Sequence, residues 1–196
     1  MFFPQDVTLE NERALLRPLQ IADLEHLLPY ALNEPDIWKF SVISPAGKTG
    51  MEQYIRETVN MRSGEKEYPF IIFDKLANQW AGCSRFYDIQ LANGTTQLGY
   101  TWYGKAFQRT GLNRHCKWLL LSYAFETWGM ERVEFRADSR NEASINAMKG
   151  IGCTVEGILR KQSPSAMGGR RDAIVLSILK EEWFKEVRNF LKAKTK

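Results

Sequence analysis

The stretch Thr101–Trp128, TWYGKAFQRTGLNRHCKWLLLSYAFETW, decides the fold of this chain. It predicts the end of a strand, then a basic loop with one glycine, and then a long apolar helix. The first backbone N–H groups of such a helix have no intrahelical partner, and the positive end of its dipole faces the loop. A helix start of this kind binds phosphate, so we expect a phosphorylated ligand here.

The loop itself is basic but matches no common nucleotide motif. Four cations, Lys105, Arg109, Arg114 and Lys117, lie around the predicted helix start and favour an anion. Residues 108–113 carry no Gly-Lys-Ser/Thr at Walker spacing, and only one of the three glycines of a dinucleotide fingerprint. A surface loop that is merely basic is the alternative interpretation.

Outward from this stretch, the hydrophobic pattern predicts one mixed α/β domain over residues 1–196. Before it, strands are predicted at 14–19, 69–73, 80–91 and 95–102, and helices at 24–28 and 51–62. After it, strands are predicted at 132–138, 153–162 and 171–179, and helices at 141–150 and 181–191. The last three strands before the loop should form an antiparallel meander, and strand, helix and strand around the loop a βαβ unit.

Composition places the chain among ordinary globular proteins and excludes several function classes. The formal charge of +4 over 196 residues suits anionic ligands but is too small for a dedicated nucleic-acid binder. The opening residues lack the basic and apolar regions of a signal peptide, and the apolar run at 118–125 is too short to span a bilayer. We therefore expect a cytoplasmic protein without membrane contact. If it forms an oligomer, a homodimer is the commonest form.

No metal site is expected from the cysteines and histidines. Cys83, Cys116 and Cys153 are odd in number and far apart, so they should be reduced thiols. His26 and His115 have no cysteine or histidine near them in sequence, and His115 is better interpreted as an anion contact or a partly buried helix residue than as a base.

Gln108-x-x-Gly111-x-Asn113, between strand and helix, resembles the acyl-CoA loop of the GNAT acetyltransferase superfamily, usually written Gln/Arg-x-x-Gly-x-Gly/Ala. Further segments, in chain order, are similar to the branch with the ribosomal-protein (Rim-type) N-terminal acetyltransferases. They are Leu98-Gly99-Tyr100, Tyr123-Ala124-Phe125-Glu126, Glu131-Arg132-Val133-Glu134, Asn141-x-x-Ser144, Glu156-Gly157-x-Leu159-Arg160, and Arg171-Asp172 running to Glu182-Trp183. The resemblance covers about residues 14–183.

This resemblance implies the acyl-CoA N-acyltransferase fold, with a mostly antiparallel central sheet, and an enzyme that moves the acetyl group of acetyl-CoA to a primary amine. The amine would attack directly in a ternary complex, and a protein or peptide N-terminus is one acceptor. The pyrophosphate would bind loop N–H groups, and the pantetheine arm would pair with the strand end. The implied acetyl-CoA residues are Tyr100, Thr101, Trp102, Gln108, Arg109, Thr110, Gly111, Leu112, Asn113, Arg114, Asn141 and Ser144.

The resemblance also suggests a partner for the leaving thiolate. Many relatives have a tyrosine where this chain has Met148, which cannot donate a proton. The Rim-type enzymes use a serine at the position of Ser144, so Ser144 is the candidate thiolate partner; a plain helix-cap serine is the alternative. A backbone N–H at or near Trp102 would polarise the thioester carbonyl. Asn113 replaces the usual small residue, but its amide can donate to a phosphate oxygen.

The residues assign no general base. Ser163 or Gln162 stands where the ribosomal enzymes carry a glutamate, and this departure leaves the acceptor open. The remaining acidic candidates, each better interpreted as a solvated surface charge, are Glu34, Asp36, Glu67, Asp88 and Asp172. The acceptor pocket is expected around 33–49 and 163–169. An acyl-CoA-binding sensor without catalysis and a small-molecule amine acetyltransferase are the alternative functions.

Overall fold

A computed structural model describes residues 6–64, 66–165 and 168–195. Residues 1–5, which belong to the opening stretch tested above for a signal peptide, lie outside the described residues. So do residues 166–167, within the expected 163–169 loop. The strands form a single sheet in the order β1-β2-β3-β4-β5-β6-β8-β7. Their bounds are β1 Leu9–Glu10, β2 Ala14–Pro18, β3 Tyr68–Asp74, β4 Gln79–Gln90, β5 Thr95–Tyr103, β6 Arg132–Asp138, β7 Thr154–Pro164 and β8 Arg170–Leu179. All neighbours are antiparallel except β5 and β6, which confirms the predicted mostly antiparallel sheet.

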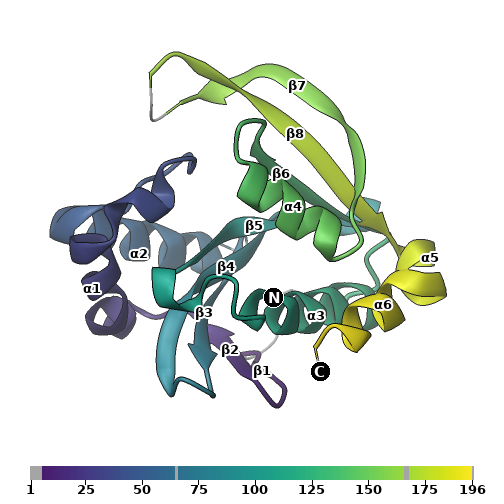
Figure 1. Cartoon of the computed structure of the whole chain (residues 1–196), viewed down its shortest axis with the longest axis horizontal. Helices are drawn as coiled ribbons and strands as arrows, with labels where there is room; N and C mark the ends of the chain where they lie inside the picture. The colour runs from purple at the N-terminus through teal and green to yellow at the C-terminus, as the bar shows by residue number, and fades with distance from the viewer. Residues whose placement is uncertain (1–5, 65, 166–167, 196) are drawn as a thin grey trace.

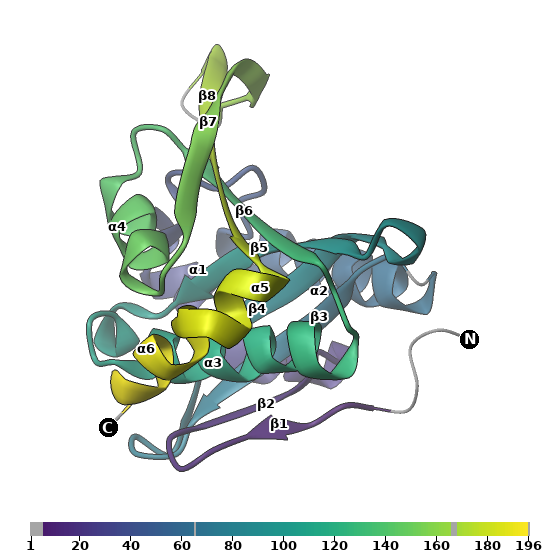
Figure 2. The ribbon, with the colours of Figure 1, turned by 90° about the vertical axis from the view of Figure 1, so that its right-hand side faces the viewer.

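The helices lie on both faces of this sheet (Figures 1 and 2). They are α1 Leu24–Asn33, α2 Gly47–Ser63, α3 Leu112–Ser122, α4 Glu142–Gly150, α5 Lys180–Glu182 and α6 Arg188–Ala193, with π-helical turns at Tyr123–Thr127 and Trp183–Val187. Short 3-10 helices span Ile21–Asp23, Pro35–Trp38, Leu91–Asn93 and Lys105–Phe107. The predicted closing helix is therefore longer than expected and is interrupted by a π-helical turn.

Two hydrophobic cores result, one on each face. The continuous apolar run of β3 serves both: Phe70 and Ile72 pack with α3 in the larger core, whereas Ile71 packs with α1 and α2 in the smaller one. Successive side chains of a strand point to opposite faces, so a strand covered on both sides needs no polar alternation. The smaller core also contains Trp38 and Trp102, whose rings meet edge to face with centroids 5.0 Å apart.

The strands β5 and β6 separate after a short stretch of pairing. Their parallel register joins Thr95–Gln97 to residues 132–134, and no further pair follows in the described part of the chain. From Leu98 to Tyr103, the edge of β5 that faces β6 therefore has no strand partner. A register shift against β4 accompanies a positive φ of 48° at Tyr100, which marks a β-bulge in this segment.

The β7–β8 hairpin projects away from the rest of the molecule, and β8 lies between β6 and β7 (Figures 1 and 2). Helix α4 contacts β6, the strand on the other side of the gap from β5. The loop before α3, helix α4 and the tip end of the hairpin, at Gln162, Ser163 and Arg171, line the same cavity as the open segment of β5.

Candidate active site

One cavity of about 1070 Å³ follows the gap between β5 and β6. This volume lies just above the range typical of ligand pockets, roughly 300–1,000 Å³. The residues expected to contact acetyl-CoA line it, apart from two: Tyr100, Thr101, Gln108, Arg109, Thr110, Gly111, Asn113, Arg114, Asn141 and Ser144. The side chains of Trp102 and Leu112 are buried in the two cores, so only their backbone groups could reach a ligand.

The loop before α3 presents backbone donors. Arg109 and Gly111 adopt positive φ angles of 61° and 92°, and Gly111 is the N-cap of α3. The Thr110 hydroxyl donates to the Phe107 carbonyl at 2.8 Å, which ties the loop to its own start. Within the described residues, the N–H groups of Arg109, Thr110 and Gly111 have no hydrogen-bond partner. Consecutive free N–H groups at a helix start form a concave anion site, so the loop fits a phosphate group.

Gly111→Ala is expected to weaken acetyl-CoA binding roughly tenfold, because alanine resists the positive φ at a cost of about 1–2 kcal/mol. A Cβ at Gly111 would meet no atom within 4 Å, so the effect comes from backbone conformation alone. Calorimetric titration with acetyl-CoA measures it. Gly64→Ala is the matched control, since Gly64 has an ordinary φ of −82° and lies outside the cavity. Equal affinities of both variants would contradict the expectation.

The cations near the loop differ in part from those expected. Arg109 and Arg114 line the cavity, and so do Arg13 and Lys194, which lie far from the loop in sequence and are not among the expected cations. Lys105 does not line it; its ammonium group pairs with Asp36 at 2.8 Å. Lys117 lines the cavity, but it is buried and not exposed.

Lys117 is buried beneath the open edge of β5, with 5% of its surface exposed. Its Nζ donates to Thr101 Oγ1 at 2.8 Å and to Ser84 Oγ at 3.3 Å, and these two hydroxyls lie 2.7 Å from each other. No carboxylate of the described chain pairs with this ammonium group. Burial therefore lowers the pKa of Lys117 to about 8.

His115 is a buried helix residue, one of the two roles expected for it. Its Nδ1 lies 3.3 Å from Glu12 Oε1. Burial lowers the pKa of His115, so the ring is largely neutral near pH 7.

Helix α4 supplies the opposite wall. Asn141 is its N-cap, and Asn141 Oδ1 accepts the Ser144 N–H at 3.1 Å. The cap fixes the first turn of α4, which places Asn141 and Ser144 together on the cavity wall. Met148 is buried at the same wall.

The far end of the cavity is built by two segments that were expected to form the acceptor pocket. Residues 40–42, between α1 and α2, line it together with Gln162 and Ser163 of β7. Arg171 of β8 joins the two segments: Nη1 donates to the Phe40 carbonyl at 2.9 Å, and Nε donates to Ser163 Oγ at 2.9 Å. Arg171 therefore fixes these two segments relative to each other.

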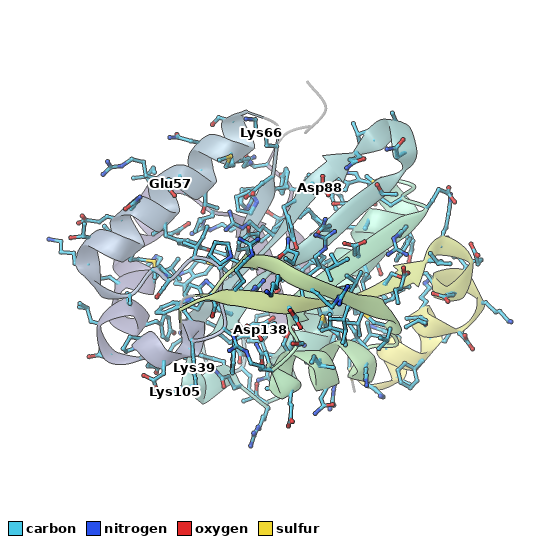
Figure 3. The ribbon with its side chains drawn as sticks, turned by 90° about the horizontal axis from the view of Figure 1, so that it is seen from above. Lys39, Glu57, Lys66, Asp88, Lys105 and Asp138 are labelled. Carbon is cyan, nitrogen blue, oxygen red and sulfur yellow. The ribbon has the colours of Figure 1, made fainter. Side chains whose placement is uncertain are left out.

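None of the five acidic candidates for a base lines the cavity. Glu34, Asp36, Glu67, Asp88 and Asp172 lie elsewhere, each in contact with a donor of the protein. Asp138, at the end of β6 beside β8 (Figure 3), is the one carboxylate among the described lining residues. It is 2% exposed and receives hydrogen bonds from the Arg140 N–H and guanidinium, which lower its pKa. Its engaged oxygens make it a poor base.

No cluster of three or more metal-ligating side chains occurs in the described parts of the chain. Across the same residues, no helix is long and apolar enough to cross a membrane.

Comparison with known proteins identifies the family. A family model described as "Acetyltransferase (GNAT) domain" matches residues 13–154. The chain is 26% identical over 181 residues to "Uncharacterized N-acetyltransferase p20" of Bacillus licheniformis, covering 90% of this chain and 98% of that protein. It is 25% identical over 181 residues to "Putative ribosomal N-acetyltransferase YdaF" of Bacillus subtilis (strain 168), covering 88% and 94%. A solved structure of a "putative acetyltransferase" from T. thermophilus shares 31% identity, superposes with a TM-score of 0.85, and is covered completely, as is this chain.

These matches confirm the expected fold and the resemblance to the branch with ribosomal enzymes. The family uses acetyl-CoA as acetyl donor, and the free loop amides and open strand edge fit such a ligand. The family model matches most of the chain, and the relatives align along nearly its whole length. The chain therefore belongs to the GNAT family of N-acetyltransferases.

Proposed function

We propose that this enzyme transfers the acetyl group of acetyl-CoA directly to a primary amine, and that the amine is the N-terminus of a peptide or protein. The observation that carries the proposal is the continuous cavity, which joins the phosphate-binding loop at one end to residues 40–42 and Ser163 at the other. Donor and acceptor can occupy it together, so the amine can attack the thioester without a covalent enzyme intermediate.

The choice of an N-terminal amine follows from the lining groups. An amine must be neutral to attack, and the described lining residues offer no free carboxylate to remove its proton. At pH 7.5, about a third of free α-amino groups are neutral, compared with roughly 0.1% of lysine ε-amino groups. A site without a base therefore favours an α-amine. The relative YdaF, whose printed name is that of a ribosomal N-acetyltransferase, is consistent with this acceptor class.

Three acceptors separate this proposal from its alternatives: a peptide with a free N-terminus and no lysine, the same peptide N-terminally blocked but with one lysine, and a small polyamine. Thiol release from acetyl-CoA measures turnover. We expect turnover with the first peptide and little with the other two. Preference for the polyamine would indicate a small-molecule enzyme.

Calorimetric titration with acetyl-CoA accompanies the assay and addresses the sensor alternative. Tight binding of acetyl-CoA with no thiol release in any of the three reactions would contradict the proposed transfer and favour a sensor.

A further inference from the structure

Lys117 is a buried amine that the resemblance to the family does not explain. It comes from the second turn of α3, lies under the unpaired segment of β5, and lines the same cavity as Thr101 and Ser144. Its hydrogen bonds go to the hydroxyls of Thr101 and Ser84. An ammonium group has three protons to donate, so one stays available toward the cavity.

The surroundings of Lys117 leave its charge uncompensated. Ser84 of β4 and Thr101 of β5 are neutral hydroxyls, and the ring of Phe135 on β6 lies 5.8 Å from Nζ. The two titratable neighbours are Cys116 on α3 and Cys153 before β7, and burial raises the pKa of both thiols to about 12, so both are neutral. A buried cation without a counterion is destabilising, and such sites are retained where the charge is used.

We propose that Lys117 donates the proton that the CoA thiolate takes up when the acetyl group leaves. The proposal rests on the transfer function above, because it places the thioester beside the open segment of β5. The acceptor nitrogen forms a bond to the carbonyl carbon, the carbon–sulfur bond breaks, and the sulfur keeps the electron pair. The sulfur then takes a proton from the Lys117 ammonium. The proton lost by the acceptor nitrogen restores Lys117 through solvent, so charge and protons balance.

This role suits the acidity of the group. Proton transfer is efficient when donor and acceptor have similar pKa values near the working pH. A free thiol has a pKa near 8.5, close to that of the buried Lys117 amine. Met148, at the place of the tyrosine found in many relatives, has no proton to give, and Ser144 would donate from a far weaker acid.

The first test needs no acceptor. Coenzyme A is bound to the wild-type protein and to Lys117→Met, and thiolate absorbance in the ultraviolet is titrated against pH. A nearby ammonium stabilises the thiolate, so we expect the acid dissociation constant of the bound thiol to be at least tenfold larger in wild type. Equal constants in the two proteins would overturn the proposal. Lys105→Met, which removes an exposed lysine outside the cavity, should match wild type.

The second test uses turnover of the N-terminal peptide. Lys117→Met is expected to lower kcat about 100-fold with little change in the KM for acetyl-CoA, as for loss of a general acid. The fall of wild-type kcat at pH above about 8 should disappear in the variant. A large loss in Ser144→Ala with normal kcat in Lys117→Met would assign the proton to Ser144 instead. Wild type without turnover would contradict the transfer function, while the thiol titration would still decide the role of Lys117.

Discussion

Gly82→Ala is expected to lower the free energy of unfolding by about 3 kcal/mol or more and to abolish measurable acetyl-CoA binding. A Cβ at Gly82 would lie 2.0 Å from the backbone oxygen of Trp102 and 2.9 Å from its carbonyl carbon. Backbone atoms have no alternative rotamer, so β5 would have to move away from β4. The displaced segment is the one expected to hold the pantetheine arm. Urea unfolding and calorimetric titration with acetyl-CoA measure the two effects.

Gly157→Ala is the matched control for this change. Gly157 also lies in a strand, β7, but a Cβ there would meet no atom within 4 Å. We expect a change in unfolding free energy of about 0.5 kcal/mol or less and unchanged binding. If Gly82→Ala retained wild-type stability, the close approach of β4 to the bulged segment of β5 would not be tight in solution.

Lys117→Met is expected to raise the free energy of unfolding at pH 7 by about 3 kcal/mol, while catalysis falls. The folded-state pKa of Lys117, about 8, lies below that of an unfolded lysine, so the unfolded chain binds the proton more tightly. Below pH 8 both states are protonated, and the wild type carries the full penalty. From pH 8 upward the wild type gains stability, and the gap closes near pH 10.4. Ser84 and Thr101 keep their mutual hydrogen bond in the variant.

Urea unfolding from pH 6.5 to 10 measures this difference. Lys185→Met removes the same charge from an exposed position and should leave stability within about 0.5 kcal/mol at every pH. A variant at Lys117 that is less stable than wild type at pH 7 would mean that the two hydroxyl contacts outweigh the cost of burying the ammonium.

The sequence predicts the strand–loop–helix unit well because its signals are local. Gly111 as N-cap, the basic loop and the apolar face of α3 all lie within one short stretch. The meander of β3, β4 and β5 follows from the change to a period of two residues and from the Asn93-Gly94 turn. The position of β8 between β6 and β7 cannot be read from the sequence, because strand order depends on contacts between distant segments.

The site was predictable in part for the same reason. The motif indicates the loop residues that line the cavity, whereas Arg13 and Lys194 reach it from opposite ends of the chain. The sequence groups Lys117 with the other cations around the helix start, so its burial gives no local signal. Lys105 was grouped with the loop cations by proximity in sequence, but Asp36 holds it elsewhere. Pairing of charges across the fold decides which cations face the ligand.

The short pairing between β5 and β6 has a consequence for cooperativity. Strands β1 to β5 and strands β6 to β8 are joined within the sheet by three register pairs at one end of the gap. Two halves so weakly joined can open as separate units in native-state hydrogen exchange. A ligand lying along the gap contacts both halves, so acetyl-CoA should merge the two exchange units into one. Acetyl-CoA would then act as acetyl donor and, while bound, would also link β5 and β6 where the two strands do not pair.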